Sequence, residues 1–241
     1  MKYPNFKDLI LFENDDYIVV NKPPFVASLD ERGAAGAGEI NILRLARQYT
    51  DDAQICHRLD KETSGAIVIA KNPEAYRNLS IQFEKRKVSK IYHAVVDGQF
   101  QFDNLFVDLP ILNDGNKNVT IDRQEGKRAE TYFTSLKYYK HYTLVECKPV
   151  TGRMHQIRIH LATQRAAICG DVMYRGKPVF LSKIKRGYRL TDEEEQPIMK
   201  RFALHAKQIT FKGVDGEDIF VEAPYPKDFA TLLKLLDKFD A

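Results

Sequence analysis

The segment CHRLDKETSGAIVIAK, residues 56–71, decides the fold prediction for this chain of 241 residues. Its second half, GAIVIAK, is a short apolar run that is typical of a fully buried strand. Arg58 and Asp60 stand just before this run, two positions apart, so in an extended segment their side chains share one face. An exposed ion pair of this kind contributes only about 0–1 kcal/mol. At the rim of a buried strand the pair is partly desolvated and needs further partners, which also makes it a candidate functional site.

The rest of the chain alternates groups of strands with helices. This order predicts an α+β fold with a mixed, largely antiparallel central β-sheet, flanked by helices and loops. The sequence shows no repeat, no heptads and no long linker, so we expect one domain over residues 1–241. The glycine-rich stretch 30–40 is expected to be a connecting loop. The expected strands are 16–24, 65–71, 90–98, 129–139, 142–150, 203–213 and 218–226, and the expected helices are 39–49, 72–86, 155–164 and 227–239.

Composition and charge set limits on the class of protein. With 44% hydrophobic and 29% charged residues, the chain resembles ordinary globular proteins. It has no apolar span of the roughly 18 residues needed to cross a membrane, and no secretory signal pattern, so we expect a cytoplasmic protein. The net charge of +4 permits a polyanionic partner without demanding one. Basic stretches at 83–90 and 175–189 are, taken alone, best interpreted as solvated faces.

The three cysteines, Cys56, Cys147 and Cys169, are an odd number without CxxC spacing. This argues against a disulfide framework and against a thiolate zinc site. We expect them to be buried structural thiols.

A second group of charged residues occurs in TGRMHQIRIHLA, residues 151–162. Arg158 rises from an otherwise apolar helical stripe close to Leu161, and a buried arginine must find an anion. Asp60 is a candidate for that anion, and a carboxylate held against a guanidinium is suited to act as a nucleophile or base. Tyr92 could cap the same pocket by stacking its ring on a flat substrate, although a core tyrosine is the alternative.

Histidines and Asp60 also offer ligand types for a metal. His155 and His160 lie five positions apart, however, which points them to different helix faces. Neither HExxH nor HxH spacing occurs around them or around His57. We therefore expect no metal site.

These motifs, taken together, resemble the RluA-type pseudouridine synthases. HRLDKETSG (57–65) is similar to the HRLDxxTSG signature of that family, and GRMHQIRIHLA (152–162) is similar to its GRTHQIRxHLA block. KIYHAVVDG (90–98) resembles its tyrosine strand. The matches run in family order from about residue 10 to residue 226. Further similar segments are YIVVNKP (17–23), ICGDVMYRG (168–176) and ALHAKQITF (203–211).

The resemblance implies a cofactor-free enzyme that isomerises uridine in RNA to pseudouridine. The base is detached from the sugar at N1, turned, and rejoined through C5. The essential aspartate of the family maps to Asp60, for which attack at the ribose C1′ and proton abstraction at C2′ both stay open. By the same resemblance, Tyr92 would stack on the flipped base and act in deprotonating C5, and Arg158 would pair with the aspartate. Arg58 would help to fill the space left by the flipped nucleotide, and Leu204 would pack against the uracil.

Departures from the family pattern are confined to three places. Phe25 stands where relatives often have glycine, which puts the geometry of that turn in doubt, and Met154 replaces a common threonine. The link 180–201 is longer than usual, and we interpret it as an insertion whose basic half contacts RNA. The first strand of the family pattern begins almost at once, so no N-terminal S4-type RNA-binding domain is expected.

The expected partner is RNA, either ribosomal large-subunit RNA or transfer RNA, with no obligatory protein partner and a monomeric state. Two other classes stay open at this point. One is a non-catalytic RNA-binding protein on the same fold, which the joint presence of Asp60, Tyr92 and Arg158 disfavours. The other is a metal-dependent hydrolase, which would lose activity with a chelator.

Overall fold

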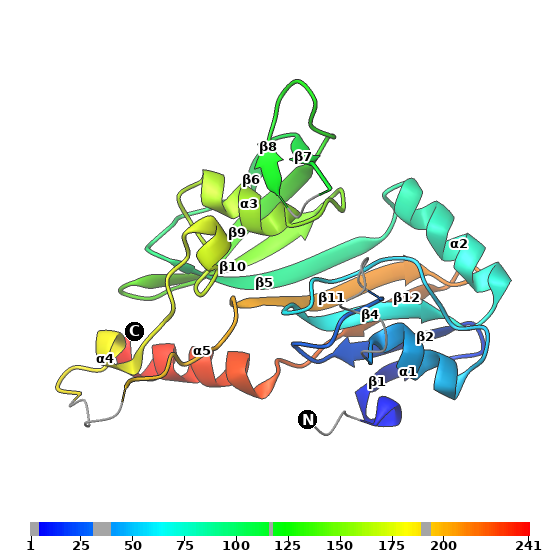
Figure 1. Ribbon diagram of the computed structural model, residues 1–241, viewed down its shortest axis with the longest axis horizontal. Helices are drawn as coiled ribbons and strands as arrows, with labels where there is room; N and C mark the ends of the chain where they lie inside the picture. Colours follow the sequence, from blue (N-terminus) through cyan, green and yellow to red (C-terminus); the bar gives the residue numbers. More distant parts are fainter. Residues whose placement is uncertain (1–4, 31–39, 116–117, 189–193) are drawn as a thin grey trace. The chain divides into compact units, whose positions relative to one another are not determined.

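The computed structural model is shown in Figure 1. The chain forms two compact units, each described by itself below, and the expectation of one domain stays a prediction. Unit 1 comprises Met1–Lys90 and His205–Pro224, and unit 2 comprises Ile91–Leu204 and Tyr225–Ala241. The residues that the structure describes are 5–30, 40–115, 118–188 and 194–241.

The sheet of unit 1 is built around β4 (Ser64–Ala70), in which every residue is buried. β2 (Tyr17–Lys22) pairs with β4 in antiparallel register, and β11 (Leu204–Lys212) pairs with it in parallel register through His205 and Ala206. The apolar run after the charged motif is therefore a fully buried strand, as expected, and it pairs with strands on both sides. The remaining strands of unit 1 are β1 (Ile10–Glu13), β3 (Gln54–Ile55) and β12 (Asp218–Glu222).

The first helix of unit 1 begins at Ile42, three residues after the expected start at 39, and the second begins where the sequence predicts. The side chain of Asn72 accepts a hydrogen bond from the amide of Ala75 at 2.8 Å, and Pro73 occupies the first turn of α2 (Pro73–Glu84). Asn41 caps α1 (Ile42–Tyr49) in the same way. A short 3₁₀ helix, η1 (Phe6–Leu9), precedes β1.

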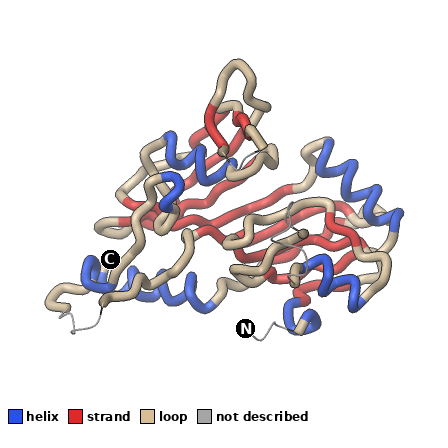
Figure 2. Tube along the Cα trace, in the orientation of Figure 1, coloured by secondary structure: helices blue, strands red, loops and turns tan. Residues whose placement is uncertain are grey.

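The sheet of unit 2 is antiparallel throughout. Figure 2 marks the strands and helices along the chain. β9 (Glu130–Tyr138) and β10 (Tyr142–Pro149) form the expected hairpin, flanked by β5 (Ser89–Asp97) and β6 (Leu105–Asp108). Helix α3 (Gln156–Thr163) contacts β9 and β10. The other elements of unit 2 are the hairpin of β7 (Ile111–Asn113) and β8 (Val119–Ile121), η3 (Val172–Tyr174), α4 (Leu181–Ile184) and α5 (Lys227–Phe239).

The sequence predicted the fold class and the long elements, but not the short strands. The mixed, largely antiparallel sheet with flanking helices is confirmed. β1, β3, β6, β7 and β8 each have four residues or fewer, too few for an alternating pattern to show. Most of the glycine-rich stretch 30–40 lies outside the described residues, so the loop prediction stays a prediction.

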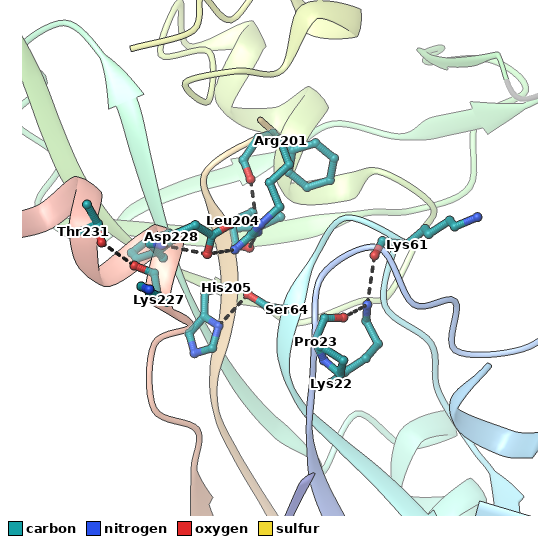
Figure 3. Close-up of polar contacts among 12 residues, drawn as sticks. Lys22, Pro23, Lys61, Ser64, Arg201, Leu204, His205, Lys227, Asp228 and Thr231 are labelled. Atoms are coloured by element: carbon teal, nitrogen blue, oxygen red, sulfur yellow. Dashed lines mark hydrogen bonds and ion pairs between the residues drawn. The ribbon is translucent and has the colours of Figure 1, made fainter. Parts of the chain in front are cut away.

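At Gly65 the backbone of β4 lies very close to that of β11. Its φ is +117°, and a Cβ placed there would lie 2.1 Å from the carbonyl oxygen of Ala206. Next to it, the hydroxyl of Ser64 and Nδ1 of His205 lie 2.9 Å apart in a buried hydrogen bond (Figure 3). The Ser-Gly pair of the motif thus has a structural purpose, which is to join β4 to β11.

Gly65→Ala is expected to lower the free energy of unfolding by about 3 kcal/mol, because backbone strain and steric overlap add. Gly216→Ala is the matched control, since Gly216 also has a positive φ, +89°, but nothing lies within 4 Å of its Cβ position. Urea denaturation of both variants measures the difference. Equal losses in the two variants would contradict the close approach to Ala206.

Candidate active site

The loop that carries Asp60 is held by a buried lysine. Lys22 is fully buried, and its ammonium group donates hydrogen bonds to the carbonyl oxygens of Pro23 and Lys61, both at 3.0 Å (Figure 3). It also donates to the carbonyl oxygen of Val26 at 2.8 Å. A buried charge is tolerated only when such acceptors surround it. Because Lys61 directly follows Asp60, this arrangement fixes the backbone beside the aspartate.

Two further contacts complete the loop. The amide of Leu59 donates to Oγ of Ser28, and that hydroxyl donates back to the carbonyl of Leu59, both at 3.0 Å. The amide of Phe25 donates to the carbonyl of Lys61 at 2.8 Å. Phe25 has a φ of +66°, so it adopts the left-handed conformation that a glycine takes readily. The turn therefore forms with Phe25 at the position where relatives often have glycine, and the left-handed conformation costs about 1–2 kcal/mol for a residue with a side chain.

Burial alternates along the motif around Asp60. Arg58 is exposed, Leu59 is buried and Asp60 is partly buried. This alternation agrees with the expectation that Arg58 and Asp60 share one face while Leu59 points to the core. The motif then turns into β4, with the amide of Thr63 donating to the carbonyl of Asp60 at 3.0 Å.

His57, considered above as a metal ligand, is instead part of the framework of unit 1. Its Nε2 accepts a hydrogen bond from the amide of Val68 at 3.0 Å, and its ring lies 4.8 Å from the ring of Phe83. Burial, assisted by the charge of Lys90, lowers the pKa of His57 to about 3. Burial also lowers the pKa of Lys90 to about 8. His57 is therefore a neutral acceptor at physiological pH.

Arg158 is a buried residue of α3, with 6% of its surface exposed. An anion lies beside it, as a buried arginine requires. Its Nε lies 2.6 Å from Oδ2 of Asp171 and its Nη2 lies 2.8 Å from Oδ1, which makes a bidentate ion pair. The guanidinium carbon lies 4.3 Å from the ring centroid of Phe202 and 5.1 Å from that of Tyr174. The pairing of Arg158 with Asp60 would join the two units and stays a prediction.

Asp171 is a site residue that the sequence analysis missed. It lies in ICGDVMYRG, which we quoted only as a family likeness. It is 2% exposed. No signal in the sequence marks it, because its burial, and with it the need for a cation, is known only from the folded structure.

Helix α3 is attached to β9 by the polar residues that surround Arg158 in the motif. The side-chain Nε2 of Gln156 donates to the carbonyl of Glu130 at 2.8 Å and to Oγ1 of Thr131 at 2.9 Å. His160 lies 2.9 Å from Oγ1 of Thr131 through Nδ1 and 2.9 Å from the carbonyl oxygen of Leu109 through Nε2. His160 is thus engaged in framework contacts, and these contacts set the position of Arg158 on its helix.

Tyr92 and Leu204 belong to the same hydrophobic cluster of unit 2. Tyr92 is partly exposed, stands opposite Cys147 in the β5–β10 ladder and packs against the cluster, and Leu204 is 4% exposed within it. The structure therefore gathers Tyr92, Arg158 and Leu204 in unit 2 and Arg58 and Asp60 in unit 1. Their assigned roles stay predictions.

Two of the three cysteines match the expectation of buried thiols. Cys147 and Cys169 are buried, and burial raises the pKa of both thiols, while Cys56 is partly buried. Within the described ranges, no group of three or more His, Cys, Asp or Glu side chains is placed to hold a metal ion. Among those residues there is also no helix long and apolar enough to span a membrane.

Comparison with known proteins gives one consistent family. A family described as RNA pseudouridylate synthase matches residues 16–163. The ribosomal large subunit pseudouridine synthase C of Salmonella typhi is 36% identical over 239 residues, covering 95% of this chain and 70% of that protein. The enzyme of the same name from Yersinia pestis is 34% identical, covering 96% of this chain and 70% of that protein.

Solved structures agree with the sequence comparison. Human RNA pseudouridylate synthase domain containing 4 superposes with a TM-score of 0.70 at 24% identity, covering 96% of this chain and 95% of that one. Human RNA pseudouridylate synthase domain containing 1 also gives 0.70, at 25% identity, covering 94% and 87%.

Together, the fold, the family match and these relatives define the class of this protein as an RNA-modifying isomerase. The chain belongs to the RNA pseudouridylate synthase family. It is an enzyme that isomerises uridine in RNA to pseudouridine.

The pKa of His57 predicts a specific acid sensitivity. The unfolded chain protonates this histidine near pH 6.5, whereas the folded protein does so only near pH 3. Between these values the unfolded state binds more protons, so stability falls as pH drops from 6.5 toward 3, by at most about 1.4 kcal/mol per pH unit.

His57→Gln keeps an acceptor for the amide of Val68 but does not titrate, so the fall in stability should be shallower in this variant. His160, whose pKa burial also lowers, stays in both proteins and leaves a residual slope of the same sign. Urea denaturation at several pH values from 4 to about 7 gives the comparison. Identical slopes in parent and variant would show that His57 is not neutral in the folded state.

Proposed function

We propose that this enzyme modifies uridine in ribosomal large-subunit RNA and that Asp60 is its essential catalytic carboxylate. The target is supported by the curated relatives, which are named ribosomal large subunit pseudouridine synthases. The observation that carries the assignment of Asp60 is the loop itself, whose backbone beside the aspartate is held by the ammonium group of Lys22.

The reaction needs a positioned carboxylate more than it needs a cofactor. The bond between N1 of uracil and C1′ of the ribose breaks, and a bond from C1′ to C5 forms. The hydrogen on C5 is lost as a proton and N1 gains one, so neither composition nor oxidation state changes. An ionised Asp60 can either attack C1′ or take the proton from C2′, and both routes require a carboxylate at a fixed place.

The other site residues receive roles that fit their surroundings. Tyr92 is partly exposed, so its ring is available to stack on the extruded base and to assist removal of the C5 proton. Arg158 carries the permanent charge that the resemblance pairs with the aspartate, and Asp171 fixes its orientation. Leu204 supplies apolar contact to the uracil, and exposed Arg58 helps to occupy the space that the nucleotide leaves.

Binding to RNA must meet the cost of extruding the uridine, which is a few kcal/mol. Exposed cations in the expected insertion 180–201 contribute by contacting phosphates, so affinity should fall with salt. In that segment Lys183, Lys185 and Arg186 are exposed. A monomer without an obligatory protein partner stays part of the proposal, and a ribosomal RNA target favours a cytoplasmic location.

Asp60→Asn tests the catalytic assignment in cells that lack the gene. The variant keeps the shape of the side chain but cannot act as nucleophile or base, so we expect modification to fall by about 10³-fold or more. The measurement is a map of pseudouridine by sequencing in ribosomal and transfer RNA, after complementation with the parent or the variant. Glu62→Gln, a neutralised carboxylate in the same loop, is the matched control and should complement like the parent.

The map gives separate answers on substrate and mechanism. We expect one or more positions in large-subunit RNA to lose pseudouridine without the gene and to regain it with the parent only. Restoration by Asp60→Asn would overturn the catalytic role of Asp60. Loss confined to transfer RNA would overturn the assigned substrate and leave the class of reaction unchanged.

A further inference from the structure

In the turn after Asp171, two adjacent apolar side chains are exposed to solvent. Val172 is 75% exposed, the most of any large hydrophobic residue that the structure describes, and Met173 is 59% exposed. Both lie in η3, in unit 2. Single exposed apolar residues are common, but adjacent ones at the tip of one turn form a small apolar surface that invites a partner.

The turn is rigidly built. The amide of Gly170 donates to the carbonyl of Lys177 at 2.9 Å, and the amide of Gly176 donates to that of Asp171 at 2.8 Å, which closes both ends. A Cβ at Gly176 would lie 1.8 Å from the carbonyl oxygen of Ile168, so the chain there is in tight contact with its neighbour. The exposed side chains are therefore presented by a fixed backbone.

The same turn holds Arg158. Asp171 makes the bidentate ion pair, and the ring of Tyr174 lies 5.1 Å from the guanidinium carbon. The sulfur of Met173 lies 3.9 Å from Nη2 of Arg158 as a weak acceptor. The exposed tip is thus in direct contact with the arginine that we assign to the reacting site.

Positive charge flanks the tip. Arg175 and Lys177 are exposed, and neither forms an ion pair with a carboxylate in the described part of the chain. Cations beside an apolar tip match a nucleic acid, which offers phosphates to the cations and base faces to the apolar atoms. RNA is therefore the occupant that this surface fits.

We propose that Val172 and Met173 pack against a base next to the extruded uridine, while Arg175 and Lys177 contact the flanking phosphates. The inference rests on the proposed function, because it takes the RNA substrate as given. Extrusion of one nucleotide removes stacking from its neighbours, and apolar contact with an exposed base face recovers part of that loss.

The test compares Val172→Ser/Met173→Ser with the parent on total RNA from cells that lack the gene. We expect about a tenfold weaker affinity in filter binding and a matching rise in KM, the loss of roughly 1.4 kcal/mol. We expect kcat to change by less than about twofold, since Asp171 and Phe202 still hold Arg158. The double variant Val172→Leu/Met173→Leu, which keeps both side chains apolar, should bind like the parent. Phe220→Ser, which replaces a 58% exposed residue in β12 of unit 1, is the control and should bind like the parent.

Each outcome decides the proposal. Parent-like binding and KM in the serine double variant would overturn it, as would a fall in kcat alone, which would mean that the turn acts only through Arg158. If the parent binds the RNA without modifying it, the proposed function fails, and the binding comparison still decides the role of the turn. If the parent neither binds nor modifies the RNA, both proposals fail.

Discussion

The buried ammonium group of Lys22 is the constraint on which the proposed active site depends. It draws the carbonyl oxygens of Pro23, Val26 and Lys61 to one point, and two of these belong to the turn after β2 while the third belongs to the Asp60 loop. Hydrogen bonds from a charged donor contribute about 1.5–3 kcal/mol each. Displacing Asp60 would break at least one of them inside the protein, where water cannot replace it.

The opposite end of the same loop is fastened by other means. The bond between Ser64 and His205 and the close approach of Gly65 to Ala206 join β4 to β11 within unit 1. In unit 2, Arg158 is held by the carboxylate of Asp171 and by two aromatic rings. The carboxylate and the rings have no part in the chemistry that we assign. Both charged groups proposed for the reaction are thus positioned in advance by residues that only support them, which is how a site avoids reorganisation during catalysis.

Sequence patterns predicted what depends on local order. Asn72 and Pro73 marked the start of α2, the apolar run marked β4, and an arginine in an apolar stripe required an anion. The identity of that anion, Asp171, could not be predicted, because a contact across a turn depends on the folded path of the chain. The role of Lys22 was hidden for the same reason, since a lysine that ends a strand gives no sign of being buried. The resemblance to a family supplied the roles of Asp60 and Tyr92, which geometry alone leaves open.

Native-state amide hydrogen exchange of Lys22→Met tests most directly whether this lysine orders the loop. The amide of Phe25 donates to the carbonyl of Lys61, and the amide of Thr63 donates to the carbonyl of Asp60. We predict that both exchange at least about tenfold faster in the variant, while the amides of β4 keep their protection, because the loop opens locally. Unchanged exchange at Phe25 and Thr63 in a folded Lys22→Met protein would contradict the account.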